Sequence, residues 1–440
     1  MKLLLALLLI PFTSIAQKNL PQLLDAYAQA EFTVKEFNGT VLVMQKGNVI
    51  YQKEFGMADR EWNIPNTINT KFRIGSVTKQ FAAACILLLL DEGKLSVDDL
   101  LSKYIPDYPK GDSITIHMLL NHTSGIKNYT DLGEFWPKAS LPLSTTEMIA
   151  LFKNKPLDFS PGTSWNYSNS GYFLLGVIVE KISGKTFSTY LLENIIQKLN
   201  LKNTNMDRLD SVLAFRAKGY SKNSKGVWAH ANYISMEIPY SAGAMFSTVE
   251  DLYLWTKALH NNQVLSAATT QKMLTPYKNN YGYGIVIDSL KTHKLVSHTG
   301  GIPGFSSYLS YFPDDDLCIA VISNNESNAG NFGTALAKIM FNLPVQKPYT
   351  PKEVTIDAAL LDNYIGKYIA TGPIELIKKE NKLYRHRDGA PDIELKAESK
   401  TRFFYADNSD RFIEFEIDNT GKIIKRWFIS NGEKIEMKKL

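Results

Sequence analysis

Apolar residues recur along this chain with two different periods, and the helical period comes first. Residues 20–36 and 76–92 have the spacing and apolar content of helices, and Gly93 closes the second run. Residues 171–184 predict a third helix, with Gly184 as its C-terminal cap. The stretch from about 95 to 275 is otherwise broken by Pro and Gly, which indicates helices joined by loops.

Strand-like runs lie at both ends of this helical region. "GTVLVMQKGNVIYQKEFG" alternates apolar and polar residues around Lys46-Gly47-Asn48 and predicts a β-hairpin. "KLVSHTG", "FSSYLSYFP" and "LCIAVISNN" predict three later strands, and "GNFGTALAKIMFNL" predicts a closing helix. Strands at both ends with helices between them predict an α+β domain whose antiparallel sheet uses both chain ends.

The pattern changes after "LPVQKPYTPK" (343–352), whose three prolines indicate a linker. Residues 363–440 contain about eight short runs rich in Tyr, Phe, Ile and Val, separated by turns. Their even spacing predicts a small antiparallel barrel or sandwich. The sequence therefore predicts a large domain over 17–342, the linker, and a small β domain over 353–440.

The first sixteen residues, "MKLLLALLLIPFTSIA", have the features of a cleavable secretory signal. Lys2 supplies the charged start, an apolar stretch follows, and Ser14-Ile15-Ala16 places small residues before the cut. No apolar run is long enough to span a bilayer. We expect a periplasmic or secreted protein without a stable membrane anchor.

Charge and cysteine usage exclude several function classes. The 440 residues carry a formal net charge of +5, and the basic residues are scattered, which does not favour nucleic-acid binding. Cys85 and Cys318 have no metal-type spacing and lie in apolar segments, so we expect buried thiols, with pairing left open. H-E-x-x-H, C-x-x-C and the phosphate-binding loop are absent, and neither a cofactor nor a metal is predicted.

Two Ser-x-x-Lys pairs are candidates for nucleophilic chemistry. Ser76 and Lys79 open the apolar helix, where positions three apart share a face and the helix N-terminus favours negative charge. An apolar wall would desolvate Lys79 and favour a neutral amine able to act as a base. Ser124 and Lys127 lie in a Gly-containing loop without such a wall, so we interpret that pair as structural.

Two further motifs follow the first pair in order, Tyr167-Ser168-Asn169 and His298-Thr299-Gly300. Together the three resemble the serine β-lactamase and penicillin-binding protein superfamily, in the form typical of class C β-lactamases and related esterases and peptidases. "MLLNHTSGI" and "SAGAMFSTVEDLYLW" are similar to structural signatures of the same group. The resemblance covers about residues 20–342 and implies a β-lactamase-like fold.

The resemblance implies an acyl-enzyme mechanism. Ser76 would attack an ester or amide carbonyl, while Lys79 and Tyr167 share the general-base and general-acid work. Tyrosine titrates near 10, so we expect Lys79 and His298, as neighbouring cations or proton donors, to bring Tyr167 nearer neutrality.

The substrate-binding residues follow from the same resemblance. Asn169 would orient Lys79 and bind an amide of the acyl group, and the backbone N–H groups of Ser76 and Gly301 would form the oxyanion hole. Gly300 and Gly301 let the strand edge approach the substrate, and Thr299 retains a hydroxyl. His117 and His122 we interpret as structural.

The third motif departs from the penicillin-recognising pattern. It has His298 instead of lysine, and Gly301 stands where Ser or Thr is usual. A mostly neutral imidazole and one hydroxyl predict weak binding of a substrate carboxylate. This favours esters, D-amino-acid amides or D-peptides. The alternatives are a β-lactamase or D-alanyl-D-alanine carboxypeptidase, and a non-catalytic sensor that binds peptidoglycan or another ligand.

The C-terminal region is similar to lipocalin-like domains fused to such hydrolases. "LDNYIGKYIATGPIELIKKENKLY" carries spaced strands with Tyr-x-Gly-x-Tyr. The resemblance implies that this domain covers the catalytic site or mediates homo-oligomer assembly, and a purely stabilising appendage is the alternative.

Overall fold

The computed structural model describes residues 20–440 apart from residues 209, 408 and 431. The predicted signal peptide, residues 1–16, lies outside the described residues. Contacts divide the described residues into two compact units, one formed by Lys35–Leu336 and one that combines Ala337–Leu440 with residues 20–34. The boundaries predicted at 342 and 353 remain a prediction.

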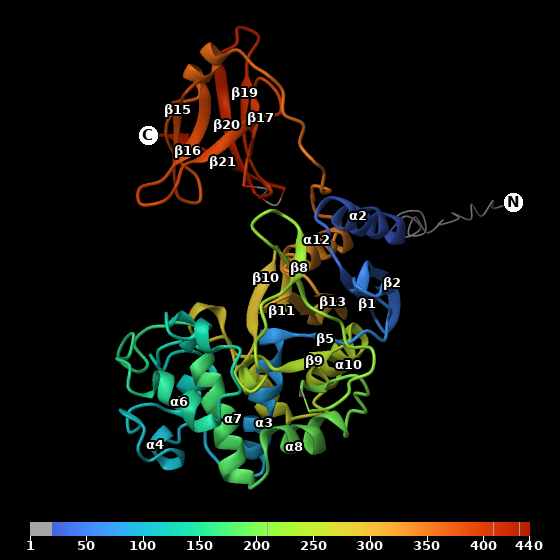
Figure 1. Cartoon of the computed structure of the whole chain (residues 1–440), viewed down its shortest axis with the longest axis vertical. Coiled ribbons are helices and arrows are strands. Elements are labelled where there is room, and N and C mark those ends of the chain that lie inside the picture. The colour runs from blue at the N-terminus through green and yellow to red at the C-terminus, as the bar shows by residue number, and fades with distance from the viewer. Residues whose placement is uncertain (1–19, 209, 408, 431) are drawn as a thin grey trace, which may run out of the picture. The chain divides into compact units, whose positions relative to one another are not determined.

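A six-stranded antiparallel sheet organises the larger unit, and it joins both ends of that unit as predicted. Strand β1 pairs with β13 along its whole length, from Gly39 opposite Ser323 to Gln45 opposite Leu317 (Figure 1). The order is β10 (Val286–Leu290), β11 (His293–Ile302), β12 (Phe305–Phe312), β13 (Leu317–Ser323), β1 (Gly39–Gln45) and β2 (Asn48–Phe55).

The predicted hairpin between β1 and β2 turns at Lys46 and Gly47. Both residues have positive φ, 50° and 78°, which is the backbone that a tight two-residue hairpin turn requires. Strands β1 and β13 are buried along almost their whole length, whereas β2 is largely half-buried. The centre of the sheet is therefore covered on both faces, and helix α10 (Val249–His260) packs against β1 and β13.

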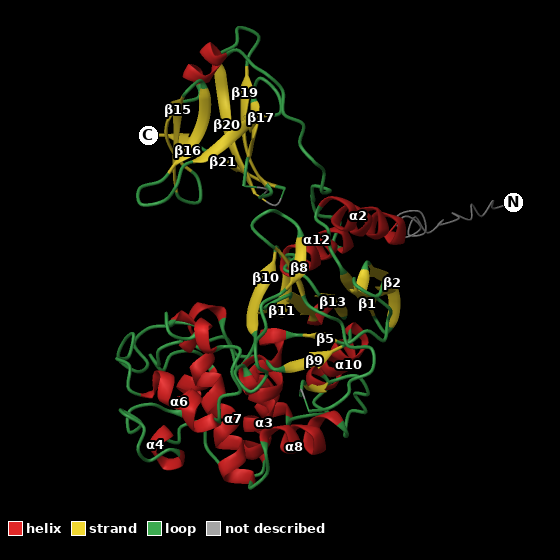
Figure 2. Ribbon diagram, in the orientation of Figure 1, coloured by secondary structure: helices red, strands yellow, loops and turns green. Residues whose placement is uncertain are grey.

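Helices dominate the middle of the chain, as the pattern predicted, and Figure 2 shows α3, α6, α7 and α8 gathered together apart from the strands of the sheet. Helix α7 ends at Gly184, whose φ of 68° confirms the predicted left-handed cap. Besides α10, the α-helices of the described residues are α2 (Leu20–Val34), α3 (Thr78–Asp91), α4 (Leu101–Tyr104), α5 (Ile116–Leu120), α6 (Thr145–Lys153), α7 (Asn169–Ser183), α8 (Phe187–Leu191), α9 (Tyr240–Gly243), α11 (Ala267–Met273) and α12 (Ala329–Met340).

Short strands that the sequence did not predict also occur between residues 57 and 247. They form small sheets of two or three strands: β3 (Met57–Asp59) with β4 (Ile64–Pro65), β5 (Phe72–Arg73) with β9 (Met245–Ser247) and β6 (Asn205–Met206), and β7 (Tyr220–Lys222) with β8 (Trp228–His230). Runs of two or three residues are too short to show a period of two, which explains why the sequence pattern missed them.

The C-terminal region forms a nearly closed antiparallel barrel, which confirms the predicted barrel. The order of its nine strands begins with β21 and ends with β22, although these two follow one another in the chain. Side chains including Leu376, Phe403 and Ile413 fill its core. The strands are β14 (Gly366–Ile369), β15 (Pro373–Lys379), β16 (Lys382–His386), β17 (Ile393–Ala397), β18 (Arg402–Tyr405), β19 (Arg411–Ile417), β20 (Ile423–Ser430), β21 (Glu433–Glu436) and β22 (Lys438–Lys439).

Helix α3, which carries Lys79 of the first motif, is held by the core of the larger unit. Phe81 stacks on Trp255 of α10 at a ring distance of 4.1 Å, and the Trp255 indole donates to Gln80 Oε1 at 2.9 Å. Cys85 on the same helix and Cys318 on β13 are free buried thiols, and burial raises the pKa of each. The described residues contain no helix with the length and apolar character needed to cross a membrane.

Candidate active site

Ser76 and Lys79 lie side by side at the start of α3. Ser76 belongs to a short 3-10 turn (Gly75–Val77) that leads directly into the helix, and Gly75 has a φ of 50°. Lys79 Nζ is 3.1 Å from Ser76 Oγ. Ser76 remains partly exposed, whereas Lys79 is fully buried, so the amine lies out of contact with solvent.

The partners of Lys79 are all uncharged. Its amino group also contacts Asn169 Oδ1 at 2.7 Å and the carbonyl oxygen of Ala242 at 2.8 Å. Desolvation lowers the pKa of Lys79 well below its usual range. A neutral amine has two protons, which serve Asn169 and Ala242, and its lone pair is then free to accept the proton of the Ser76 hydroxyl.

Tyr167 lies beside the same amine, just before helix α7. Lys79 Nζ is 4.8 Å from the centre of its ring. Burial raises the pKa of Tyr167 well above its usual range, and a hydrogen bond with Ser76 opposes this shift only in part. The expectation that Lys79 and His298, as neighbouring cations or proton donors, bring Tyr167 toward neutrality is wrong, because the burial of Tyr167 itself dominates its pKa. Tyr167 therefore keeps its proton and is suited to donate it.

Asn169 opens α7 and is fixed by a residue that the sequence analysis missed. Its Oδ1 accepts from Lys79, while its backbone N–H and its Nδ2 donate to Asn128 Oδ1 at 3.0 and 3.2 Å. Asn128 is buried and lies 41 residues away in sequence. No local pattern marks it, since only the fold brings it to the start of α7.

The third motif lies on β11, with its backbone against the turn that carries Ser76. A Cβ atom on Gly75 would lie 2.8 Å from Gly301 N, and one on Gly300 would lie 2.0 Å from the Ile74 carbonyl oxygen. A Cβ atom on Gly301 itself would meet nothing within 4 Å. Glycine is therefore required at 75 and 300 by close approach, whereas Gly301 leaves open space beside an exposed Thr299.

His298 is buried, and both of its ring nitrogens are engaged. Nδ1 lies 2.6 Å from the Thr299 carbonyl oxygen, to which it donates, and Nε2 lies 2.9 Å from the hydroxyl of Tyr281. Desolvation, aided by Lys79, lowers the pKa of His298 to about 4. The imidazole is therefore neutral near pH 7. Tyr281, in the run "YGYG", was not singled out from the sequence.

His122 packs against the tyrosine rings of this site and makes no hydrogen bond with Ser76. Its ring lies 4.3 Å from Tyr167, 4.5 Å from Tyr281 and 5.2 Å from Tyr172. Its Nδ1 accepts the backbone N–H of Ser168 at 3.2 Å, and desolvation lowers its pKa well below the usual range. The position agrees with the structural interpretation of this residue.

The second Ser-x-x-Lys pair has no comparable geometry. Ser124 is buried, and its Oγ accepts the backbone N–H of Ile126 at 3.2 Å. Lys127 forms an ion pair with Asp158 at 2.8 Å. A charged, engaged lysine beside an inaccessible hydroxyl is not suited to nucleophilic catalysis.

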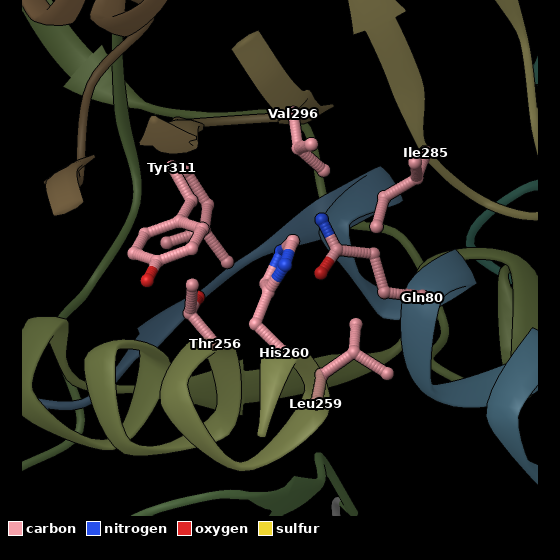
Figure 3. Close-up of a pocket in the computed structure, with 8 residues that line it drawn as sticks. Gln80, Thr256, Leu259, His260, Ile285, Val296 and Tyr311 are labelled. Atoms are coloured by element: carbon pink, nitrogen blue, oxygen red, sulfur yellow. The ribbon is translucent and has the colours of Figure 1, made fainter. Parts of the chain in front are cut away.

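A small cavity lies between Gln80 of α3 and the residues Thr256, Leu259 and His260 of α10. Figure 3 shows the Gln80 amide and the His260 ring turned toward one another in it, with Val296 and Ile285 above them. Its volume of about 10 Å³ suits roughly one water molecule, so it is too small for a substrate. In the part of the chain that the structure describes, no group of His, Cys, Asp or Glu side chains has the arrangement of a metal site.

The family model described as Beta-lactamase matches residues 29–340. A penicillin-binding protein of Bacillus subtilis is 30% identical over 405 residues, which cover 84% of this chain and 88% of that protein.

Two solved structures also align with the chain. The D-stereospecific amidohydrolase from a Streptomyces species is 25% identical, with a TM-score of 0.62 over 70% of this chain and 97% of that one. The octameric penicillin-binding protein homologue from Pyrococcus abyssi shares the fold at a TM-score of 0.69, over 95% of this chain and 99% of that one, with 24% identity.

Proposed function

The chain belongs to the beta-lactamase family of serine hydrolases, and we propose that it cleaves small esters or amides through an acyl-enzyme on Ser76. The observation that carries this proposal is the fully buried amine of Lys79, 3.1 Å from Ser76 Oγ, whose pKa burial lowers well below the usual range. A serine hydroxyl is a weak nucleophile until a neighbouring base removes its proton, and a neutral amine can do so.

In the proposed acylation, Ser76 Oγ attacks the substrate carbonyl carbon while its proton passes to the lone pair of Lys79. The tetrahedral intermediate then collapses, and the leaving alcohol or amine takes a proton from Tyr167, whose raised pKa keeps it protonated until that step. Lys79 returns its proton to Tyr167. Water completes the cycle by attacking the acyl-enzyme, with the same groups acting in reverse.

The backbone N–H groups of Ser76 and Gly301 are the proposed oxyanion hole. The close approach of Gly75 to Gly301 supports this, since it holds the edge of β11 against the turn that carries the nucleophile. Fixed donors of this kind stabilise the developing negative charge without having to reorganise during the reaction.

Substrates that carry no carboxylate on the leaving group are favoured. His298 is neutral, and Gly301 has no side chain to bind such a carboxylate. The structural relative described as a D-stereospecific amidohydrolase supports D-amino-acid amides alongside short-chain esters. D-peptides belong to the same proposal.

A β-lactamase or a D-alanyl-D-alanine carboxypeptidase is the second candidate. The name of the Bacillus subtilis relative and the exposed hydroxyl of Thr299 favour it. A sensor without catalysis is less well supported, because a buried, desolvated lysine beside a partly exposed serine is costly to maintain without a chemical use.

Export to the periplasm or the medium stays part of the proposal, on the strength of the N-terminal pattern. Homo-oligomer assembly is likewise proposed, with the C-terminal domain as the interface, and the octameric Pyrococcus abyssi protein with the same fold supports the assembly itself.

Hydrolysis assays test this function. Wild-type protein is expected to hydrolyse p-nitrophenyl acetate or the p-nitroanilide of a D-amino acid, and Ser76→Ala to lose that activity. Activity retained in Ser76→Ala contradicts the mechanism, and wild-type protein without activity on either substrate contradicts the function.

A further inference from the structure

His298 has no hydrogen-bond donor left for a substrate. A carbonyl oxygen only accepts, so Nδ1 must carry the ring proton that it donates to Thr299 O at 2.6 Å. In the neutral ring Nε2 is then an acceptor, and it takes the hydroxyl proton of Tyr281 at 2.9 Å. The ring is therefore held in a single tautomer by one bond at each nitrogen.

From these contacts we propose that Tyr281 is a specificity-determining residue, which keeps the third motif neutral and so selects substrates whose leaving group carries no carboxylate. The inference rests on the proposed function and adds to it the residue that sets the substrate class. To bind a carboxylate through Nε2, His298 would have to gain a proton there, and the Tyr281 hydroxyl occupies that position.

The surroundings of His298 oppose that protonation as well. The titratable groups that face it are Tyr281 and Tyr167, with ring centres 5.8 and 6.4 Å away, together with Lys79 on α3 and His122. Lys79 and His122 are bases whose protonated forms would repel an imidazolium. Neither tyrosine is ionised near neutral pH, because burial raises the pKa of both.

Tyr281 is itself fixed by packing, and the hydroxyl of its neighbour Tyr172 already donates to the Leu120 carbonyl oxygen at 2.6 Å. It is 2% exposed, and its ring packs against His122 at 4.5 Å and Trp165 at 6.1 Å. A buried tyrosine that donates to a buried histidine satisfies both polar groups, which makes the neutral pair the stable arrangement.

Tyr281→Phe removes the hydroxyl and keeps the ring, so it tests the inference directly. Suitable probes are the acetyl esters of meta-hydroxybenzamide and of meta-hydroxybenzoate, which differ only in the carboxylate. Wild-type protein is expected to prefer the benzamide ester in kcat/KM. Tyr281→Phe is expected to reduce that preference about tenfold at mildly acidic pH, the scale of one charge-assisted hydrogen bond.

Tyr283→Phe is the matched control. The Tyr283 hydroxyl makes the same type of bond, at 2.7 Å to His117 Nδ1, but His117 belongs to none of the three motifs. This variant is expected to keep the wild-type preference between the two esters. An equal loss of preference in Tyr283→Phe would show that the effect is not specific to His298 and would overturn the inference.

Nitrogen NMR of labelled histidine gives a readout that does not depend on turnover. In the wild type, His298 is expected to be the neutral Nδ1–H tautomer at neutral pH. In Tyr281→Phe, the His298 ring is expected to take up a second proton at a higher pH than in the wild type. A cationic or Nε2–H ring in the wild type overturns the inference. Hydrolysis of both esters with an unchanged preference in Tyr281→Phe overturns it too, whereas wild-type protein that hydrolyses neither ester overturns the proposed function itself.

Discussion

The amino group of Lys79 lies 3.1 Å from the hydroxyl oxygen of Ser76, and no part of the lysine is exposed to solvent. Its other two partners, Asn169 Oδ1 and the Ala242 carbonyl, are uncharged. A protonated amine in this position would be a buried charge without a counter-ion, which is costly. The neutral form avoids that cost and is the form that can accept a proton from Ser76.

Replacing Lys79 by arginine tests the role of that neutral amine. Arginine stays protonated in proteins, so Lys79→Arg keeps hydrogen-bond donors but cannot accept the Ser76 proton. We expect the acylation rate to fall by about a hundredfold or more, the usual contribution of a general base. Stopped-flow measurement of acylation by an activated ester checks this, and a rate within a fewfold of wild type would rule out Lys79 as the base.

The protonation state of Lys79 also predicts how stability depends on pH. The unfolded chain holds this lysine protonated up to about pH 10.4, whereas burial lowers its pKa in the folded state well below the usual range. The unfolded state therefore binds more protons, and the free energy of unfolding rises with pH until the unfolded pKa is passed.

Lys79→Met isolates this effect, because it removes the titrating group and retains an apolar side chain. Relative to this variant, the wild type is expected to gain up to about 1.4 kcal/mol of stability per pH unit as the pH rises toward about 10, and no more above it. Chemical denaturation of both proteins across that range measures the difference. A difference that does not change with pH would mean that folded Lys79 is charged.

Gly300 and Gly301 form a matched pair for the geometry of the third motif. In Gly300→Ala the new Cβ would lie 2.0 Å from the Ile74 carbonyl oxygen and 2.3 Å from Ser307 Oγ, so the strand must move. We expect a loss of about 1–3 kcal/mol of stability, with activity lost as well. Gly301→Ala, with open space at its Cβ, is expected to change stability by less than about 0.5 kcal/mol. Thermal unfolding and ester hydrolysis of both variants check this, and equal destabilisation would contradict the close packing.

Much of the fold could be predicted because its elements are long and periodic. Helices α3 and α7 and the hairpin of β1 and β2 have apolar patterns and glycine-marked ends that local sequence makes plain. The sheet from both chain ends followed from the order of those elements. The small sheets of β3 to β9 were missed, since strands of two or three residues show no period.

The candidate site was predictable only where a motif marks it. Ser76, Lys79, Tyr167, Asn169 and His298 stand in three short motifs, and the structure brings them together. Asn128 and Tyr281 belong to no motif. Asn128 acts through Asn169, which is 41 residues away in sequence, and Tyr281 acts through His298, which lies on β11. The pKa of Tyr167 was expected to move in the wrong direction, because sequence shows that Lys79 and His298 are basic but not how strongly burial acts on Tyr167.

The exposed space at Gly301 predicts how β-lactam recognition responds to mutation. The kcat/KM of the wild-type protein is expected to be at least about tenfold lower for β-lactams than for short-chain esters. The reason is that one charge-assisted hydrogen bond to the β-lactam carboxylate is missing. Gly301→Thr adds a hydroxyl beside Thr299 without a steric clash at Cβ. It is expected to raise kcat/KM for a cephalosporin and leave that for p-nitrophenyl acetate nearly unchanged.

Spectrophotometric assays on the two substrates provide the comparison, with Gly301→Ala as the control that fills space without a hydroxyl. Lysine at position 298 is a poorer test, because it would place a second amine in the buried surroundings of Lys79. A wild-type protein that hydrolyses a cephalosporin faster than any ester or D-amino-acid amide would refute the carboxylate argument.

The central claim is that Ser76 is the activated nucleophile, and labelling with a fluorophosphonate followed by peptide mapping tests it most directly. The wild-type protein is expected to gain a single phosphonyl group on the peptide that contains Ser76. Ser124→Ala should label as the wild type does, since Ser124 is buried and its Oγ accepts a bond from Ile126, whereas Ser76→Ala should not label. Full labelling of Ser76→Ala, or a phosphonyl group mapped to another serine in the wild type, would contradict the account.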